Sequence, residues 1–419
     1  MNRLRILFAF LAMVLLLLLA GGRTEAFHSG GVAECGGCHS MHSPKAGGDY
    51  LLIGTDGSST CLTCHMHAGD TGPSSYHIAT AEADMGAGVP PKQRTPGGDF
   101  GWLRKSYTMT IRGTTSTEEG ATHGHNIVAV DTTFVADVTN TTAPGGTFTS
   151  ANLGCQSCHD PHGRVRRRSN GTYATSATLG GTADPIVSSG SYGAVPLAGQ
   201  AVGTYRLLRG LNDTSVSGVT FSGVGIAVVP SSYNRTESST QTRVAYGATG
   251  INTWGNWCAS CHPNMHSSGN YVHPVDQSLG SGVANIYNAY VKSGDLSGSE
   301  TSSFTSLVPF AENTDDIATL AAHAKNDDSY LNGPGSSDKV VCLSCHRAHA
   351  SGFPEALRWN MEGEFMIYNS LFPGTDNGTP AQFARGRLAA ETQAAYYDRP
   401  VTKFASYQRV LCNKCHAKD

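Results

Sequence analysis

The chain begins with one continuous apolar run, after which long segments with a regular hydrophobic period are few. Residues 6–20 are almost wholly apolar, follow Arg3 and Arg5, and precede the small-residue stretch 24–26. This order predicts a secretory signal peptide over residues 1–26 that is cleaved from the mature chain. The apolar run is about 15 residues long, somewhat short for a membrane span. We therefore expect export and no membrane span in the mature chain.

After residue 27, apolar and polar positions form short irregular stretches more often than helical periods. Stretches rich in Thr, Ser, Gly and Val, as in 107–115 and 216–229, predict short strands and loops. The interpretation is therefore a mostly irregular chain with a few short helices and short strands. Helical periods occur in four segments, which are 283–292, 315–325, 380–397 and 403–412.

Composition agrees with this scarcity of regular structure. Glycine contributes 50 of 419 residues, charged residues are 15% and aromatic residues 8%. Such a chain buries little side-chain area per residue, so we expect its core to consist of bound groups with the polypeptide wrapped around them. No linker is long enough to divide it, which predicts a single domain over residues 27–419. The formal net charge of −3 gives no indication of a nucleic-acid partner.

All twelve cysteines occur in six Cys-x-x-Cys-His motifs. This signature attaches haem c through two thioether bonds, and the adjacent histidine binds the iron. Zinc sites are the alternative, but zinc does not require a histidine directly after each of six cysteine pairs. We therefore expect six haems c per chain and one hexahaem domain. The attaching cysteines are Cys35, Cys38, Cys61, Cys64, Cys155, Cys158, Cys258, Cys261, Cys342, Cys345, Cys412 and Cys415, and the proximal ligands are His39, His65, His159, His262, His346 and His416.

Eleven further histidines are available for the six distal positions. The first, third and fifth motifs extend to Cys-x-x-Cys-His-x-x-His, and each is preceded by another histidine upstream. The chain thus divides into three predicted two-haem modules, about 27–66, 121–265 and 320–419. The predicted distal ligands are His42, His162 and His349 after these motifs, and His28, His125 and His323 upstream of them.

Some histidines remain as alternatives to this assignment. Only three residues follow His416, so the sixth haem must draw its distal ligand from earlier in the chain. This counts against ligands placed just after a plain motif, namely His67 and His266, and more weakly against His77 and His273. The last two remain reserves, and we interpret His123 as a bystander beside His125.

One dense basic run, Arg164 with 166–168, is also open to two interpretations. The first is a solvated loop, and the second is pairing with haem propionates.

Two neutral imidazoles on one iron fill both axial positions and leave no site for a small substrate, and they favour a low potential. We therefore expect an electron-transfer protein with no catalytic residues. Two alternatives are a monomeric periplasmic electron shuttle and, less favoured, a multihaem reductase of a small oxyanion.

Several stretches that extend beyond the haem motifs resemble the outer-membrane cytochrome S family. These stretches are 27–35, 67–77, 233–237, 342–353 and 411–419. The resemblance implies a secreted, extracellular protein whose subunits stack head to tail into a nanowire filament threaded by a continuous haem chain. It further implies electron transfer from upstream outer-membrane cytochromes to extracellular acceptors such as ferric oxides, electrodes or partner cells.

The resemblance also implies that His42 ligates the fifth haem of the neighbouring subunit, the one on His346. If the same rule of serving the haem two places back holds inside the chain, His162 serves the first haem and His349 the third. We then expect the upstream histidines to serve the even haems, with His28, His125 and His323 on the second, fourth and sixth.

Overall fold

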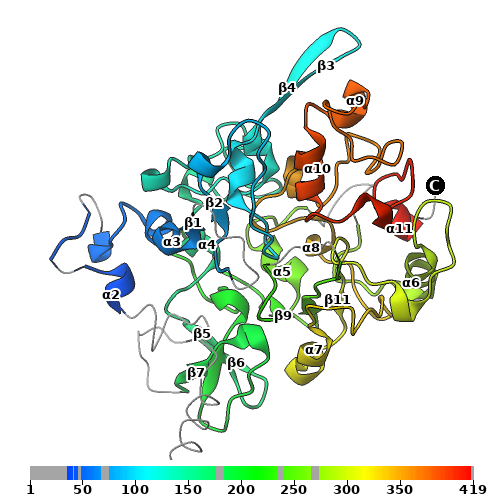
Figure 1. Ribbon diagram of the computed structural model, residues 1–419. Helices are drawn as coiled ribbons and strands as arrows, with labels where there is room; N and C mark the ends of the chain where they lie inside the picture. Colours follow the sequence, from blue (N-terminus) through cyan, green and yellow to red (C-terminus); the bar gives the residue numbers. More distant parts are fainter. Residues whose placement is uncertain are drawn as a thin grey trace, which may run out of the picture.

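The computed structural model describes residues 35–40, 42–45, 49–67, 75–175, 184–234, 239–265 and 273–416 (Figure 1). The expected signal peptide lies outside these residues. Within the described ranges, no helix combines the length and apolar character needed to cross a membrane.

Helices are short, and six of them contain one or both cysteines of a haem motif. Asp56 caps the nine-residue helix α3 by accepting a hydrogen bond from the Ser59 N–H. The α-helices are α2 (Cys35–Cys38), α3 (Gly57–His65), α4 (Cys155–Cys158), α5 (Trp254–Ala259), α6 (Gly280–Ala289), α7 (Ile317–His323), α8 (Cys342–Cys345), α9 (Ala381–Ala384), α10 (Ala389–Ala395) and α11 (Asn413–His416).

Single turns of 3-10 helix connect many of these elements. They are η1 (Asp49–Leu51), η2 (Glu82–Asp84), η3 (Phe100–Arg104), η4 (Gly120–His123), η5 (Val130–Thr132), η6 (Ser150–Asn152), η7 (Gly190–Tyr192), η8 (Tyr205–Leu207), η9 (Glu300–Ser302), η10 (Pro354–Ala356) and η11 (Val401–Lys403).

Strands form four small sheets with the orders β1-β2, β3-β4, β6-β5-β8-β7 and β11-β10-β9. The strands are β1 (Met66–His67), β2 (Ala79–Thr80), β3 (Tyr107–Ile111), β4 (Thr114–Glu118), β5 (Val165–Arg168), β6 (Tyr173–Thr175), β7 (Ile186–Ser188), β8 (Ala201–Gly203), β9 (Ile226–Val228), β10 (Ala245–Gly247) and β11 (Ala311–Glu312). Most of the described chain lies between these elements, which confirms the expectation of a mostly irregular fold.

The longest strand pair is the hairpin β3-β4, which projects from the body of the molecule (Figure 1). Its turn contains Arg112 and Gly113, both with positive φ, of 50° and 84°. Two successive left-handed residues match the twist of a two-residue hairpin turn. The short strands and loops expected in 107–115 are therefore strand β3, this turn and the start of β4.

Other expected elements are shorter than the sequence indicated. The helix expected over 380–397 is interrupted at Arg385 and Gly386, which have φ of 51° and 78° and separate α9 from α10. The prediction of a helix over 403–412 is wrong, because the described chain is irregular between η11 and α11. In 216–229 only β9 is a strand.

The basic run 164–168 is also not a solvated loop. Residues 165–168 form strand β5, in the middle of the four-stranded sheet, and Arg166 and Arg167 are buried. Their guanidinium groups donate to the carbonyl oxygens of Asp184 and Ala194. Pairing with β6 and β8 holds the backbone of this run in the sheet.

The hydrophobic core is divided into several clusters rather than one. The largest gathers Trp359, Met366, Tyr396 and Leu411, together with other buried side chains, and a second surrounds Trp254. Both lie beside the haem motifs, since Cys345 and Cys412 pack against the first cluster. The polypeptide therefore packs in small units around the positions of the six motifs.

Candidate haem centres

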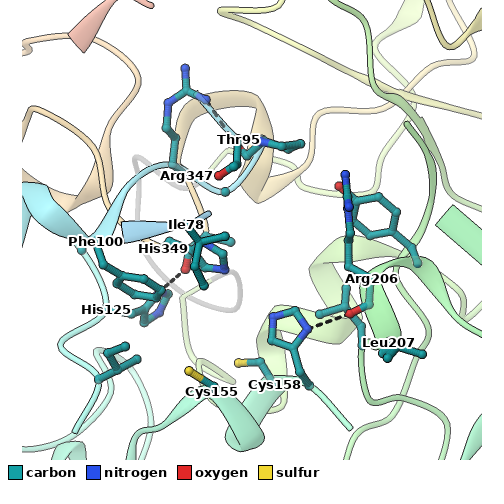
Figure 2. Close-up of a pocket in the computed structure, with 18 of the residues that line it drawn as sticks. Ile78, Thr95, Phe100, His125, Cys155, Cys158, Arg206, Leu207, Arg347 and His349 are labelled. Atoms are coloured by element: carbon teal, nitrogen blue, oxygen red, sulfur yellow. Dashed lines mark hydrogen bonds between the residues drawn. The ribbon is translucent and has the colours of Figure 1, made fainter. Parts of the chain in front are cut away.

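A single cavity of about 3380 Å³ runs through the molecule and connects the motifs. Cysteines from all six Cys-x-x-Cys-His motifs line it. Figure 2 shows one part of this cavity, where Cys155 and Cys158 lie across from His349, with Arg206 beside them. The space and the thiols that a continuous row of haems requires are therefore in one place.

Local folding orients five of the six proximal histidines in the same way. A backbone carbonyl lies 2.7–2.8 Å from the Nδ1 atom of the histidine, and because a carbonyl only accepts, Nδ1 carries the hydrogen. The other ring nitrogen, Nε2, is then free to bind a metal. The pairs are His39 with Tyr50, His65 with Tyr76, His159 with Arg206, His262 with Pro144, and His346 with Glu355.

The carbonyls that hold the first, third and fifth histidines belong to one recurring turn. In each turn two successive residues have positive φ, as at Arg206 (50°) and Leu207 (53°), and the next residue pairs with the histidine in a β-bridge. Left-handed residues turn the carbonyl of the first one back towards the ring. The three turns are Tyr50-Leu51-Leu52, Arg206-Leu207-Leu208 and Glu355-Ala356-Leu357.

An arginine follows two of these turns and fixes the cysteine helix. Arg209 donates from Nε to the Gln156 carbonyl oxygen at 2.7 Å, and Arg358 donates equivalently to the Leu343 carbonyl oxygen at 2.7 Å. Their backbone N–H groups also donate to the second cysteine of the motif. In the first turn Ile53 keeps only the backbone bond, to Cys38. The sequence analysis missed these turns because their spacing from the motif varies.

Neighbouring thiols place the motifs in chain order along the cavity. Cys61 and Cys155 are hydrogen-bonded, which raises the pKa of the Cys61 thiol, and Cys342 acts in the same way on Cys258. Burial raises the pKa of Cys38, Cys158 and Cys345, and nearby thiols of the next motif add to this effect. Successive motifs therefore meet through the pairs Cys38/Cys64, Cys61/Cys155, Cys158/Cys261, Cys258/Cys342 and Cys345/Cys412.

Four proximal histidines face a second histidine across the cavity. Two imidazoles on one iron, each at about 2.0 Å from nitrogen to metal, have ring centres about 6.3 Å apart. The observed centroid distances are 6.3 Å for His39 with His162, 6.3 Å for His159 with His349, 6.1 Å for His262 with His125, and 6.4 Å for His416 with His273. Each separation fits an iron between the rings.

Burial prepares these imidazoles for metal binding. It lowers the pKa of His159 to about 4 and that of His349 to about 3; nearby His65 further lowers the pKa of His159, and nearby His159 further lowers that of His349. Both side chains are therefore neutral at physiological pH, which is the form that binds a metal.

The pair at His416 differs from the expectation. The sequence analysis assigned His323 to the sixth haem, but the structure brings His273 to His416 instead. His323 ends helix α7, stacks on the Tyr330 ring at 4.1 Å, and its Nδ1 atom lies 2.7 Å from Glu312. His273 reaches this position because α6, seven residues after it, packs against α11.

The other histidines are placed as follows. His28 and His266 lie outside the described residues, and His67 stacks on His77 at 4.9 Å. His123 is fully buried away from the other histidines, between the Trp102 carbonyl oxygen and Glu118. Its role as a bystander beside His125 agrees with these contacts.

The fifth motif differs from its neighbours. Across the described part of the chain, no second histidine ring lies opposite His346, and His42 is exposed without a ring partner. Two proximal histidines, His65 and His346, thus have no facing histidine among the described residues; His28, predicted for His65, lies outside them, and His42 is the remaining predicted distal histidine for His346.

Buried cations show that the cavity fits haem rather than an apolar ligand. Arg347 and Arg358 are 2% exposed, and both line or adjoin the cavity. Neither has a carboxylate partner among the described residues, and the Nε atom of Arg347 makes no hydrogen bond there. A buried guanidinium requires an anion, and a haem propionate supplies one. The donor set and these cations therefore fit six haems.

Comparisons with known proteins agree with this chemistry. No protein-family model matches the chain. It is 51% identical over 431 aligned positions to the c-type cytochrome OmcS of Geobacter sulfurreducens, covering 96% of each sequence. A cryo-electron-microscopy structure of OmcS nanowires and a structure of the outer membrane cytochrome S filament, both from Geobacter sulfurreducens, match with a TM-score of 0.85 each, at 50% and 49% identity, covering 94% of this chain and 100% of theirs.

Proposed function

The chain belongs to the OmcS family of c-type cytochromes, and from this membership we propose that it is an extracellular protein that polymerises into filaments conducting electrons. Each subunit carries six haems c, attached through the twelve cysteines of its six motifs. It transfers electrons and is not an enzyme. The observation that carries the proposal is the single cavity lined by all six motifs in chain order.

Each haem has two histidine ligands in this proposal. The first haem is held by His39 and His162, the third by His159 and His349, and the fourth by His262 and His125. Centroid distances of 6.1–6.3 Å support these three pairs. The first two pairs follow the expected rule, in which the histidine after one odd motif serves the previous odd haem, and the third places the upstream His125 on the fourth haem as expected.

For the sixth haem, we propose His273 as the distal ligand in place of His323. The 6.4 Å between the His273 and His416 rings supports this change. For the second haem, His65 is the proximal ligand and His28 remains the proposed distal one. An upstream histidine then serves each even haem, although His273 lies outside the third module predicted over about 320–419.

The fifth haem is completed by the neighbouring subunit. His346 is its proximal ligand, and His42 of the next copy is the proposed distal ligand. An exposed His42 and a His346 without a facing ring, among the described residues, support this assignment. The histidine after each odd motif is proposed to serve the haem two places earlier. For His42, which follows the first motif, that haem is the fifth haem of the neighbouring subunit.

Bound haem supplies reversible one-electron chemistry. Side chains of this subunit, with His42 of the next copy at the fifth haem, would supply both histidine ligands of each iron, so small molecules would be excluded from the irons, and buried arginines would balance the propionates. Because thiols of consecutive motifs adjoin, electrons can pass along the chain in sequence order. Upstream outer-membrane cytochromes are the proposed donors, and ferric oxides, electrodes or partner cells are the proposed acceptors.

Replacing His42→Ala tests the filament and its junction together. We expect the first haem to be spared, because Cys35, Cys38 and His39 attach it. The fifth haem becomes high-spin, and electron microscopy shows few or no filaments. Added imidazole restores the low-spin spectrum without restoring assembly, because a free ligand does not link subunits.

His162→Ala is the matched control, because His162 holds the same place in its motif but serves a haem of its own subunit. We expect one high-spin haem and filaments of normal subunit repeat. Filaments of normal repeat from His42→Ala would overturn the junction assignment. A wild-type protein that is monomeric by microscopy would instead favour the periplasmic shuttle.

A further inference from the structure

Asp99 is a fully buried carboxylate at the start of the 3-10 helix η3. It accepts hydrogen bonds from the backbone N–H groups of Thr80 (2.8 Å), Gln93 (2.9 Å) and Gly101 (2.7 Å). The Thr80 hydroxyl adds a fourth at 2.5 Å. Four hydrogen-bond donors thus converge on one carboxylate that lies outside the haem motifs.

The donors favour the ionised carboxylate. Burial raises the pKa of Asp99, and the four hydrogen bonds act in the opposite direction. Backbone N–H groups can only donate, so a proton on the carboxyl would have to go to the Thr80 hydroxyl. That oxygen already accepts from the Lys92 N–H at 2.8 Å, and so its own hydrogen points to Asp99. Asp99 is therefore held as an anion.

A cation does not balance this charge within the described part of the chain. Asp99 forms no ion pair there. Arg347, whose side chain passes near Gly98, stacks its guanidinium on the Tyr397 ring at 3.7 Å and directs Nη1 to the Pro96 carbonyl oxygen. The negative charge is thus stabilised by dipoles alone.

The segment that carries Asp99 wraps the His349 ring. The Phe100 ring stacks on it, with centroids 4.6 Å apart and planes 21° apart. The backbone N–H of His349 donates to the Gly97 carbonyl oxygen at 2.7 Å. Figure 2 shows Phe100 and His349 together beside Cys155 and Cys158. Asp99 therefore adjoins one haem position in particular.

We propose that Asp99 is a fixed buried anion that lowers the reduction potential of the third haem. The proposal rests on the proposed ligation of that haem by His159 and His349. Ferric haem carries one more positive charge than ferrous haem, so a nearby anion stabilises the oxidised form. In the interior this interaction is weakly screened. Asp99 thereby makes the third haem a site that donates its electron readily to the next.

Spectroelectrochemical titration of Asp99→Asn filaments tests this role. We expect one sixth of the haem absorbance change to move to higher potential, by about tenfold in the reduction equilibrium or about 59 mV for one electron. The shift persists at high salt, because the charge is buried. The low-spin spectrum is unchanged, since His349 is retained.

Two controls separate charge from packing. Asp315→Asn removes an exposed carboxylate and leaves all potentials unchanged. Thr80→Val alters the same pocket but keeps the Asp99 charge, so the third haem stays at its low potential. If the asparagine variant fails to fold, Asp99→Ser removes the charge without turning an amide N–H towards the three backbone donors.

Absence of a shift in both neutral variants would overturn the proposal, as would an equal shift in Thr80→Val. A shift that disappears at high salt would also overturn it, because it would report a screened surface charge. Failure of the ligation itself is distinguishable: His349→Ala would then leave every haem low-spin.

Discussion

The sixth haem offers a sharp test, because sequence and structure favour different distal ligands. Replacing His273→Ala removes the ring whose centroid lies 6.4 Å from that of His416. Replacing His323→Ala removes a ring that stacks on Tyr330 and contacts Glu312. Only the first change is expected to leave an iron with one axial ligand.

The magnitude follows from the geometry. Two rings on one iron need centres about 6.3 Å apart. The centroid distance of 6.4 Å between His273 and His416 differs from this value by only about 0.1 Å. One haem in six should therefore become five-coordinate. Carbon monoxide binds ferrous haem only where an axial position is open, so titration of the reduced filament counts such sites directly.

We expect one carbon monoxide per chain for His273→Ala and none for His323→Ala or for the wild-type filament. The His323→Ala variant should instead have a slightly lower free energy of unfolding, because Glu312 loses its contact with His323 and keeps its ion pair with Arg243. One site in His323→Ala and none in His273→Ala would refute the assignment and restore the ligand that the sequence indicated.

Two further predictions concern the polypeptide itself. Glu118→Gln should cost about 3–5 kcal/mol of unfolding free energy, because it leaves the fully buried Arg387 unpaired, whereas its exposed neighbour Glu119→Gln should cost less than about 0.5 kcal/mol; guanidinium midpoints measure both. Burial raises the pKa of Glu118, but the contacts with His123 and Arg387 outweigh burial and lower this pKa below 4.5. The difference in unfolding free energy between wild type and Glu118→Gln should therefore close as pH falls below about 4.5. A difference that stays constant with pH would refute this. Gly113→Val should cost about 1–2 kcal/mol, because the position has φ of 84°, and leave the haem spectrum unchanged.

The sequence was informative wherever chemistry is written in a short motif. Six Cys-x-x-Cys-His signatures predicted six centres, and the added histidines predicted which rings face His39, His159 and His262. These predictions depend on residue type and order along the chain, which the sequence contains. Low helical content followed from the glycine count and the scarcity of hydrophobic periods.

The remaining features depend on contacts that spacing does not record. His273 lies 69 residues before Cys342, and only the packing of α6 against α11 brings it to His416. The left-handed turn that holds His159 follows it by 47 residues, whereas the equivalent turn follows His346 by nine, so no fixed interval reveals the motif. Asp99 is likewise one carboxylate among many until its four donors are seen together.

The two classes of haem explain why one bond should join each pair of subunits. In the proposed ligation, histidines after the odd motifs each serve the previous odd haem, so this series steps back by two and must leave the subunit once, at His42. The even motifs lack that histidine, as Cys61–His65 shows, and in the same proposal their haems draw ligands from upstream within the same chain. If the even motifs also carried it, two coordination bonds would have to form at every junction. A single exposed ligand at one end and a single incomplete haem near the other make the head-to-tail contact directional, because neither end can pair with its own kind.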